Sequence, residues 1–269
     1  MTEAVVVTGG LVYEAGGQRL DVYRPRTAPT ASPVVLLWHG RGPDERDVLA
    51  ALARAAAASG VVCFVPDWRP DAHDGGRSHL SESVLFVQRY GADFGGDSAR
   101  IVLAGWSLGG KAAMAAALKP SALEGWRPRA VVGIAGGYTG PAPLTGRAPI
   151  DELTGTEESV PAIPVWLIHG TADPVVDVEQ SRRLHAALRH RGWPTSLHET
   201  DTDHAGVIMT EYDPVHHRCR PSDADHAVRG GNRTAQLLVR AANTGASARQ
   251  PRRASPKGRA AGLGSVSTA

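Results

Sequence analysis

Continuous apolar runs, rather than alternating ones, constrain the fold of this chain more than any other feature of its sequence. A strand that is buried on both faces of a sheet has such a run. The runs are Val34–Trp38, Val61–Val65, Ile101–Ala104, Val131–Ile134 and Val165–Ile168. The stretches that suit helices are Glu45–Ser59, Leu80–Tyr90, Leu108–Leu118 and Val178–Arg191. This alternation predicts an α/β protein with a parallel sheet, covered by helices on both faces.

The chain departs from this pattern at its start and near its middle. Short β-like pieces surround two glycine pairs, Gly9-Gly10 and Gly16-Gly17, which predicts hairpin turns. The segment Tyr138–Pro161 is rich in Gly, Pro and Thr and is long for a connection between core strands, which is typical of a functional loop. The predicted body is completed by a last strand and a last helix, at Thr195–Glu199 and Asp225–Ala241.

Composition divides the chain into a body and a tail. Hydrophobic residues make up 42% of the 269 positions, enough for the core of one large domain, which we place at residues 1–242. Residues 243–269 carry basic side chains and no acid among Ala, Gly, Ser and Pro, which predicts a basic, disordered tail. The body is mildly acidic, so no nucleic-acid partner is expected.

The sequence also suggests where the protein works. The N-terminal residues lack a basic segment followed by an apolar one, so no signal peptide is predicted. No apolar run is long enough to predict a membrane span. The two cysteines, Cys63 and Cys219, cannot build a disulfide framework. We therefore expect a cytoplasmic protein, and the sequence leaves its oligomeric state open.

The pattern Gly-x-Ser-x-Gly occurs at Gly105-Trp106-Ser107-Leu108-Gly109. A predicted strand precedes it and a predicted helix follows it, so the serine lies on a sharp strand-to-helix turn. The glycines let the strand and the helix approach closely, and the serine then projects at the carboxyl end of the sheet. This context predicts a nucleophile rather than an incidental serine in a glycine-rich turn.

A serine nucleophile needs a base, and the base needs an acid to orient it. Asp173 follows one predicted strand and His204 follows the next, so both lie at the carboxyl edge of the sheet. We predict that His204 is the base and Asp173 the acid, with Asp177 as the alternative acid. Asp203 adjoins His204 in sequence and is badly placed to orient its ring. His169 is expected to brace the loop that carries Asp173.

Acyl transfer also needs hydrogen-bond donors for a tetrahedral oxyanion. The turn His39-Gly40-Arg41-Gly42 follows the first long buried strand and can aim its N–H groups into the cleft. The predicted donors are the backbone N–H groups of Leu108 and Arg41, with Gly42 as a further candidate. His39 is expected to brace this turn. The residues predicted to line the substrate pocket are Trp106, Trp38 and Tyr138.

Taken together, these segments resemble the α/β-hydrolases of the carboxylesterase and lipase kind. The resemblance covers roughly residues 11–241 and rests on the motifs at residues 20–25, 39–42 and 105–109 and on the loops of Asp173 and His204. It implies the α/β-hydrolase fold with an eight-stranded, mostly parallel sheet, antiparallel strands near the start and no metal or organic cofactor. Arg41 stands where the hormone-sensitive-lipase-like branch has glycine. There is no large cap insertion, so Tyr138–Pro161 forms at most a small lid.

The predicted function is hydrolysis of small or short-chain carboxylic esters through an acyl-serine. An arylformamidase or other small-amide hydrolase, or a thioester hydrolase, uses the same three side chains and stays open as an alternative. A hydrolase-fold protein that only binds a ligand or partner is the alternative from another class. The polar stretch around His216, His217 and Cys219 fits no standard zinc spacing and is predicted to be a solvated loop.

Overall fold

The computed structural model describes residues 4–27, 31–155 and 160–244. Its main element is an eight-stranded sheet with the strand order β1-β2-β4-β3-β5-β6-β7-β8. Strand β2 pairs antiparallel with β1 and with β4, and every later pair is parallel. The strands are β1 (Val5–Val12), β2 (Arg19–Pro25), β3 (Ser32–Trp38), β4 (Val62–Pro66), β5 (Gly96–Trp106), β6 (Ala130–Ile134), β7 (Val165–Gly170) and β8 (Thr195–Thr200). The predicted architecture is confirmed.

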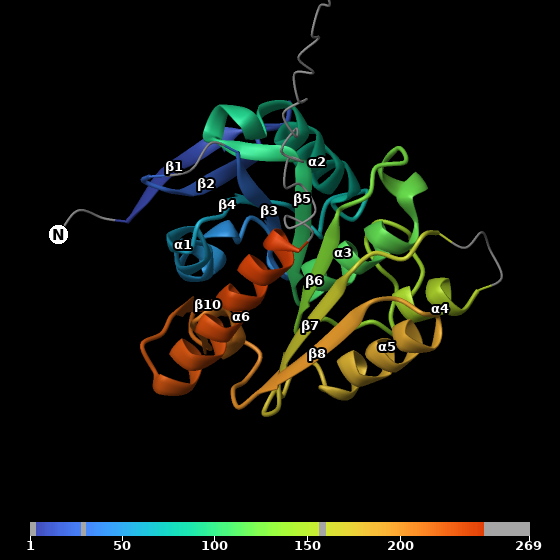
Figure 1. Cartoon of the computed structure of the whole chain (residues 1–269). Helices are drawn as coiled ribbons and strands as arrows, with labels where there is room; N and C mark the ends of the chain where they lie inside the picture. Colours follow the sequence, from blue (N-terminus) through green and yellow to red (C-terminus); the bar gives the residue numbers. More distant parts are fainter. Residues whose placement is uncertain (1–3, 28–30, 156–159, 245–269) are drawn as a thin grey trace, which may run out of the picture.

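Helices cover both faces of this sheet, as Figure 1 shows. One face carries α1 (Ala50–Ala58) and α6 (Asp225–Asn243), which pack against each other. The other face carries α2 (Arg77–Tyr90), α3 (Leu108–Leu118) and α5 (Glu179–His190). Short 3₁₀ helices occur as η1 (Arg46–Leu49), η2 (Gly91–Phe94), η3 (Pro120–Leu123) and η4 (Gly206–Ile208). In Figure 1 the carboxyl ends of β7 and β8 turn into loops at the lower edge of the view.

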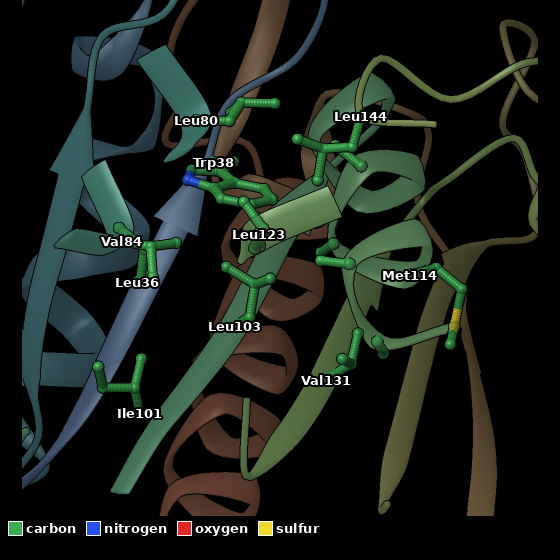
Figure 2. Packing of buried hydrophobic residues seen from close by; sticks show 14 of the residues in the cluster. Leu36, Trp38, Leu80, Val84, Ile101, Leu103, Met114, Leu123, Val131 and Leu144 are labelled. Atoms are coloured by element: carbon green, nitrogen blue, oxygen red, sulfur yellow. The ribbon is translucent and has the colours of Figure 1, made fainter. Parts of the chain in front are cut away.

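The two covered faces explain the continuous apolar runs. In β3, Val34 and Leu36 pack into one core cluster, whereas Val35 and Leu37 pack into the cluster on the opposite face. Successive side chains of a strand point to opposite faces, so burial on both faces requires every residue to be apolar. Figure 2 shows the first cluster, where Leu36, Trp38 and Leu103 of the sheet meet residues of the helical layer.

The predicted turn at Gly9-Gly10 is wrong. Strand β1 runs through both glycines, and its register against β2 shifts between Thr8 and Leu11. The backbone N–H of Gly10 donates to Asp21 Oδ1 at 2.8 Å, and Gly10 has a positive φ of 71°. Glycine serves here as a bulge that bends an edge strand. At the second pair the chain does turn, because Gly17 N–H donates to the carbonyl of Glu14.

The segment Tyr138–Pro161 differs from the expected lid in its described part. It contains the short helix α4 (Pro149–Thr154), which packs against α3 and α5. Its residues 156–159 lie outside the described chain, as do residues 245–269 of the predicted tail.

A small hairpin, missed by the sequence analysis, follows the loop of His204. Its strands are β9 (Thr210–Asp213) and β10 (Arg218–Pro221), which pair antiparallel. His216 and His217 lie at its turn, so the predicted solvated loop is in part a hairpin. Among the helices of the described ranges, none has the length and apolar character needed to cross a membrane.

Candidate active site

The backbone of Ser107 is held in a strained conformation between β5 and α3. Its φ is 56° and its ψ is −116°, a region that residues other than glycine rarely adopt. Such a residue costs about 1–3 kcal/mol and persists only where its surroundings enforce it. Part of that enforcement is a hydrogen bond from the Ser107 N–H to the carbonyl of Ile134, at 2.8 Å, which ties the turn to β6.

Glycines make this turn possible because strand, helix and the neighbouring turn touch backbone to backbone. A Cβ on Gly105 would overlap the backbone of Gly109. A Cβ on Gly109 would overlap the carbonyl oxygens of Trp38 and His39. The strand-to-helix turn at Ser107 therefore depends on the absence of side chains at these glycines. Ser107 lies at the carboxyl edge of the sheet, as predicted.

The N-terminus of α3 and the turn after β3 meet beside Ser107. Leu108 is the first residue of α3, and the first N–H groups of a helix have no partner within it. The turn after β3 approaches the same point, because a Cβ on Gly40 would lie 3.4 Å from the Cβ of Ser107 and 2.9 Å from the ring of Trp106. The predicted oxyanion turn and the helix N-terminus are thus neighbours of the serine.

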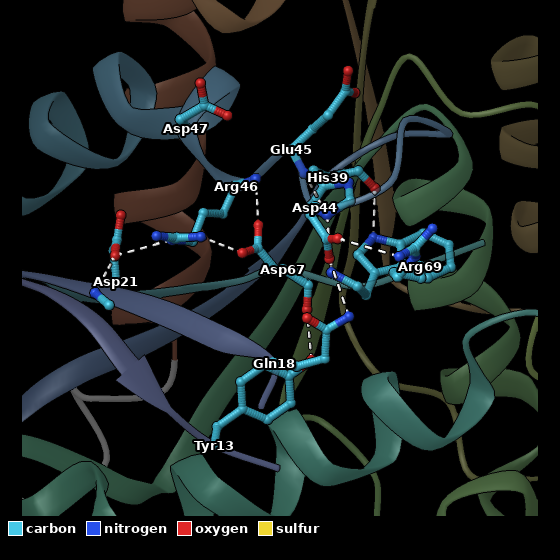
Figure 3. Close-up of polar contacts among 12 residues, drawn as sticks. Tyr13, Gln18, Asp21, His39, Asp44, Glu45, Arg46, Asp47, Asp67 and Arg69 are labelled. Atoms are coloured by element: carbon cyan, nitrogen blue, oxygen red, sulfur yellow. Dashed lines mark hydrogen bonds and ion pairs between the residues drawn. The ribbon is translucent and has the colours of Figure 1, made fainter. Parts of the chain in front are cut away.

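His39 braces this turn from inside the protein (Figure 3). Its side chain is fully buried, and its Nε2 accepts the N–H of Trp68 at 3.1 Å and that of Glu45 at 3.3 Å. Nε2 therefore carries no proton, and Nδ1–H donates to the carbonyl of Gly40 at 3.2 Å. Burial lowers the pKa of His39 to about 3, so the ring is neutral at pH 7.

An ion-pair network anchors the residues that follow the turn, as Figure 3 also shows. Arg46 pairs with Asp67, at the end of β4, and with Asp21 of β2 at 3.0 Å. Asp67 also accepts the backbone N–H of Arg46 at 3.1 Å, and its carbonyl accepts the hydroxyl of Tyr13. The network joins η1 to β2 and to the residues that directly follow β1 and β4. The sequence analysis did not predict it, since its members are far apart in the chain.

Gly42, the further candidate for an oxyanion donor, lies against the carboxylate of Glu45. A Cβ on Gly42 would overlap the carboxylate of Glu45, which lies over its N–H. Burial raises the pKa of Glu45, while the charge of Arg218 and the N–H of Gly42 lower it. The carboxylate of Glu45 therefore lies against Gly42, and the role of Gly42 as an oxyanion donor stays a prediction.

Asp173 and His204 form a buried hydrogen-bonded pair. The Nδ1–H of His204 donates to Asp173 Oδ2 at 2.7 Å, and the Asp173 side chain has no exposed area. Asp173 Oδ1 accepts the backbone N–H groups of Val175 and Val176, at 2.8 and 2.9 Å. Burial alone would raise the pKa of Asp173, but the hydrogen bonds from His169 and His204 outweigh it and hold that pKa well below its usual range. The carboxylate is therefore ionised.

His169 fixes this carboxylate from the other side. Its Nε2 lies 2.8 Å from the carbonyl of Val176 and 3.1 Å from Asp173 Oδ2. A carbonyl only accepts, so Nε2 carries the proton and donates to both oxygens. Nδ1 then accepts the hydroxyl of Ser181 at 2.7 Å. Ser181 was not predicted, because nothing in its local sequence indicates a partner on β7.

The other acids near this loop have different partners. Asp177 is exposed and accepts the N–H of Glu179 at the start of α5, at 2.9 Å. Asp203 turns back onto its own loop and accepts the N–H groups of Ala205 and Gly206. The structure therefore brings Asp173, and neither Asp177 nor Asp203, to the ring of His204.

Trp106 joins the serine turn to the histidine loop. Its indole N–H donates to the carbonyl of His204 at 2.9 Å, and the two rings lie 5.1 Å apart. Only 8% of His204 is exposed. Since Nδ1 of His204 is bonded to Asp173, its Nε2 is the nitrogen that remains for a serine hydroxyl. Trp106 thus has a positioning contact that sequence alone did not indicate.

The two other aromatic pocket candidates lie in the core. Trp38 is fully buried and donates its indole N–H to the hydroxyl of Ser83 at 3.0 Å. Tyr138 is also fully buried. Neither presents surface to a ligand, so the structure does not support a pocket-lining role for them. Within the described ranges, no group of three or more His, Cys, Asp or Glu residues is arranged to hold a metal ion.

The architecture and this arrangement define the α/β-hydrolase fold. No family model matches the sequence, and no curated protein matches it. Among solved structures, the chain is similar to Esterase B of Lactobacillus rhamnosis, with 17% identity, a TM-score of 0.66 and 91% and 89% of the two chains covered.

Two further structures show the same likeness. An esterase of Pyrobaculum calidifontis has 20% identity and a TM-score of 0.61, over 88% of this chain and 84% of that one. A carbohydrate esterase from gut microbiota has 14% identity and a TM-score of 0.65, over 90% and 99%. At such identities, the likeness establishes the fold that the sequence analysis predicted.

Proposed function

We propose that this protein is a serine hydrolase that cleaves carboxylic esters through an acyl-serine. The observation that carries the proposal is the hydrogen bond of 2.7 Å between His204 Nδ1 and the buried, ionised Asp173, in a loop that Trp106 ties to the strained Ser107. Esterases among the structural neighbours support the choice of ester chemistry.

In the proposed mechanism, Ser107 Oγ attacks the ester carbonyl while His204 Nε2 takes the hydroxyl proton. The carbonyl oxygen becomes an oxyanion, which accepts the backbone N–H groups of Leu108 and Arg41. Asp173 holds the imidazole tautomer and stabilises its positive form. The alcohol leaves with the proton from His204, and an acyl-serine remains. Water then attacks with the same proton transfers and releases the acid.

We further propose that the substrates are small or short-chain esters. The described part of the segment Tyr138–Pro161 packs beside α3 and α5 and adds no broad cover over the site. A large apolar cover is what would bury a long acyl chain. One structural neighbour, the Esterase B named above, is described with a tributyrin phosphonate inhibitor, which supports this size class.

The test is hydrolysis of para-nitrophenyl esters, from acetate to palmitate, by the wild type and by Ser107→Ala. We expect activity on the short esters that Ser107→Ala abolishes while its circular dichroism stays unchanged. Ser59→Ala, at a hydroxyl bonded only to Ala55 at the end of α1, is the matched control and should keep full activity.

Labelling with a fluorophosphonate distinguishes the ways in which this proposal can fail. A wild type that is labelled on Ser107 but cleaves no ester would point to amide or thioester substrates. A wild type that is neither labelled nor active would be a binding protein with a hydrolase fold. Full activity of Ser107→Ala would contradict the assignment of the nucleophile.

A further inference from the structure

A lysine lies one helical turn from the candidate nucleophile and takes no part in the mechanism proposed above. The backbone N–H of Lys111 donates to the carbonyl of Ser107 at 3.2 Å. Its half-buried side chain extends along the loop that follows β6: a Cβ on Gly140 would lie 3.2 Å from Nζ, and one on Gly137 would lie 4.0 Å from Cε. The ammonium group therefore lies against the loop that follows β6 and not in open solvent.

The loop beside Lys111 is held in a defined position. Three donors converge on the side-chain oxygen of Gln180 in α5: the N–H of Tyr138 at 3.0 Å, the N–H of Thr139 at 3.1 Å and the hydroxyl of Thr139 at 2.9 Å. Gly137 lies near Val176, which belongs to the loop of Asp173. The ammonium of Lys111 thus lies against a fixed loop, and that loop also contacts the loop of Asp173.

A second cation, Arg41, belongs to the turn after β3. Arg41 is exposed and follows Gly40, which lies against Ser107. Lys111 and Arg41 therefore flank the same serine, Lys111 from the first turns of α3 and Arg41 from the turn after β3. Burial lowers the pKa of Lys111, and the positive charge of Arg41 lowers it further. No carboxylate of the described ranges forms an ion pair with Lys111 or Arg41. The acid of this turn, Glu45, lies over Gly42, and the cation that lowers its pKa there is Arg218.

Two neighbouring cations that lack an internal counter-ion favour an anionic ligand, which relieves their repulsion and compensates for desolvation. We propose that Arg41 and Lys111 form a subsite for an ionised carboxylate, so that the preferred substrates are esters that carry a free carboxylate near the scissile bond. This inference rests on the proposed function, because it names the substrate class of the same site.

The test compares matched esters that differ in one charge. On the acyl side, the pair is the para-nitrophenyl monoester of glutaric acid and para-nitrophenyl valerate. On the alcohol side, it is meta-acetoxybenzoate and phenyl acetate. The measured quantity is the ratio of kcat/KM for the anionic ester to that for the neutral ester. We expect a ratio above about tenfold in at least one pair, the size of one charge-assisted hydrogen bond.

Variants of the lysine test the source of the preference. We expect Lys111→Met to lower the ratio about tenfold and Lys111→Arg to retain it, since the lost interaction is a charged one. Lys119→Met is the matched control, because Lys119 follows the same helix about 12 Å further along its axis and should leave the ratio unchanged. Raising the salt concentration from about 0.02 M to about 0.5 M should lower the wild-type ratio several-fold by screening.

Two results would overturn the subsite: a ratio near one for both pairs in an enzyme that hydrolyses the neutral esters, or an anionic preference that Lys111→Met leaves intact. If Lys111→Met does not fold, the wild-type ratio and its salt dependence decide in its place. The absence of both ester turnover and labelling on Ser107 is a different failure, since it overturns the proposed function itself.

Discussion

The two halves of the candidate site are built by different forces. The half around Ser107 depends on backbone contact: glycines let β5, α3 and the turn after β3 touch, and a neutral, buried His39 braces that turn. The half around Asp173 depends on charge: a buried carboxylate accepts hydrogen bonds from two histidines and two backbone N–H groups.

This difference predicts how each half responds to substitution. A contact between backbones has no room for an added atom, so the serine half should fail by losing stability. A charged hydrogen-bond network keeps its shape when one atom changes, so the acid half should fail by losing activity.

Removing the charge of Asp173 should have the largest effect. Asp173→Asn keeps the shape of the side chain but favours the wrong tautomer of His204, and we expect kcat to fall by about 10⁴-fold. Asp177→Asn is the matched control and should stay within a few-fold of the wild type, because the Asp177 carboxylate accepts the N–H of Glu179 at the start of α5. Ester hydrolysis measured for both variants checks this. Equal losses in the two would remove the distinction between the acids.

Adding one methyl group to the serine half should cost stability instead. We expect Gly109→Ala to lower the free energy of unfolding by about 3 kcal/mol or more, because the Cβ meets carbonyl oxygens of Trp38 and His39. In Gly137→Ala the Cβ lies 3.7 Å from Val176, an ordinary contact, and the loss should be small. Urea unfolding of the two variants provides the comparison. A stable Gly109→Ala would mean that the turn at Ser107 can accommodate an added Cβ that the structure leaves no room for.

His39 should make the serine half sensitive to acid. Its folded pKa of about 3 lies below the value of about 6.5 in an unfolded chain, so at intermediate pH the unfolded state takes up a proton that the folded state excludes. Its contribution to stability is therefore complete above pH 6.5 or so and declines as the pH falls, by up to about 1.4 kcal/mol per pH unit.

Urea unfolding at several pH values between about 7 and 5 measures this slope. We expect His39→Gln to have a shallower slope than the wild type, although it is less stable throughout. His73→Gln, at an exposed histidine, should keep the wild-type slope. If His39→Gln and the wild type had the same slope, the histidine would be accessible to protons in the folded state.

The contact that joins the two halves should contribute least. Trp106→Phe removes the N–H that donates to the carbonyl of His204, and we expect a loss of about 1–2 kcal/mol in unfolding free energy. Trp166→Phe is the control, because the indole nitrogen of Trp166 is buried without a hydrogen-bond partner. Chemical unfolding of both variants separates the hydrogen bond from the loss of ring area. Equal losses would show that the hydrogen bond itself contributes nothing.

Prediction from sequence succeeded where a pattern is local. Helix α3 has the predicted bounds, Leu108–Leu118, because its alanine-rich sequence follows directly on the glycine turn. The buried strands were recognisable because two covered faces demand an unbroken apolar run. The bulge at Gly10 and the hairpin β9–β10 were missed, because both depend on a pairing partner and not on the local residues.

The same division holds within the candidate site. The positions of Ser107, Asp173 and His204 at the carboxyl edge were predictable because each follows a recognisable strand, and parallel strands bring their carboxyl ends to one edge. The engagement of Gly42 by Glu45 and the burial of Trp38 and Tyr138 were not, since each depends on which face of the turn or loop packs inward.

Local sequence was enough to set the succession of strands and helices, the alternation that buries the sheet on both faces, and the positions at which polar residues follow strands. These follow from backbone geometry and from the period of apolar residues. The pairing of His204 with Asp173 rather than Asp177, the hydrogen bond of Trp106 that joins the two halves, and the position of Lys111 against the loop after β6 came only from the folded arrangement. These are contacts between segments distant in the chain, and their energies depend on distances of a few ångströms that no local pattern encodes.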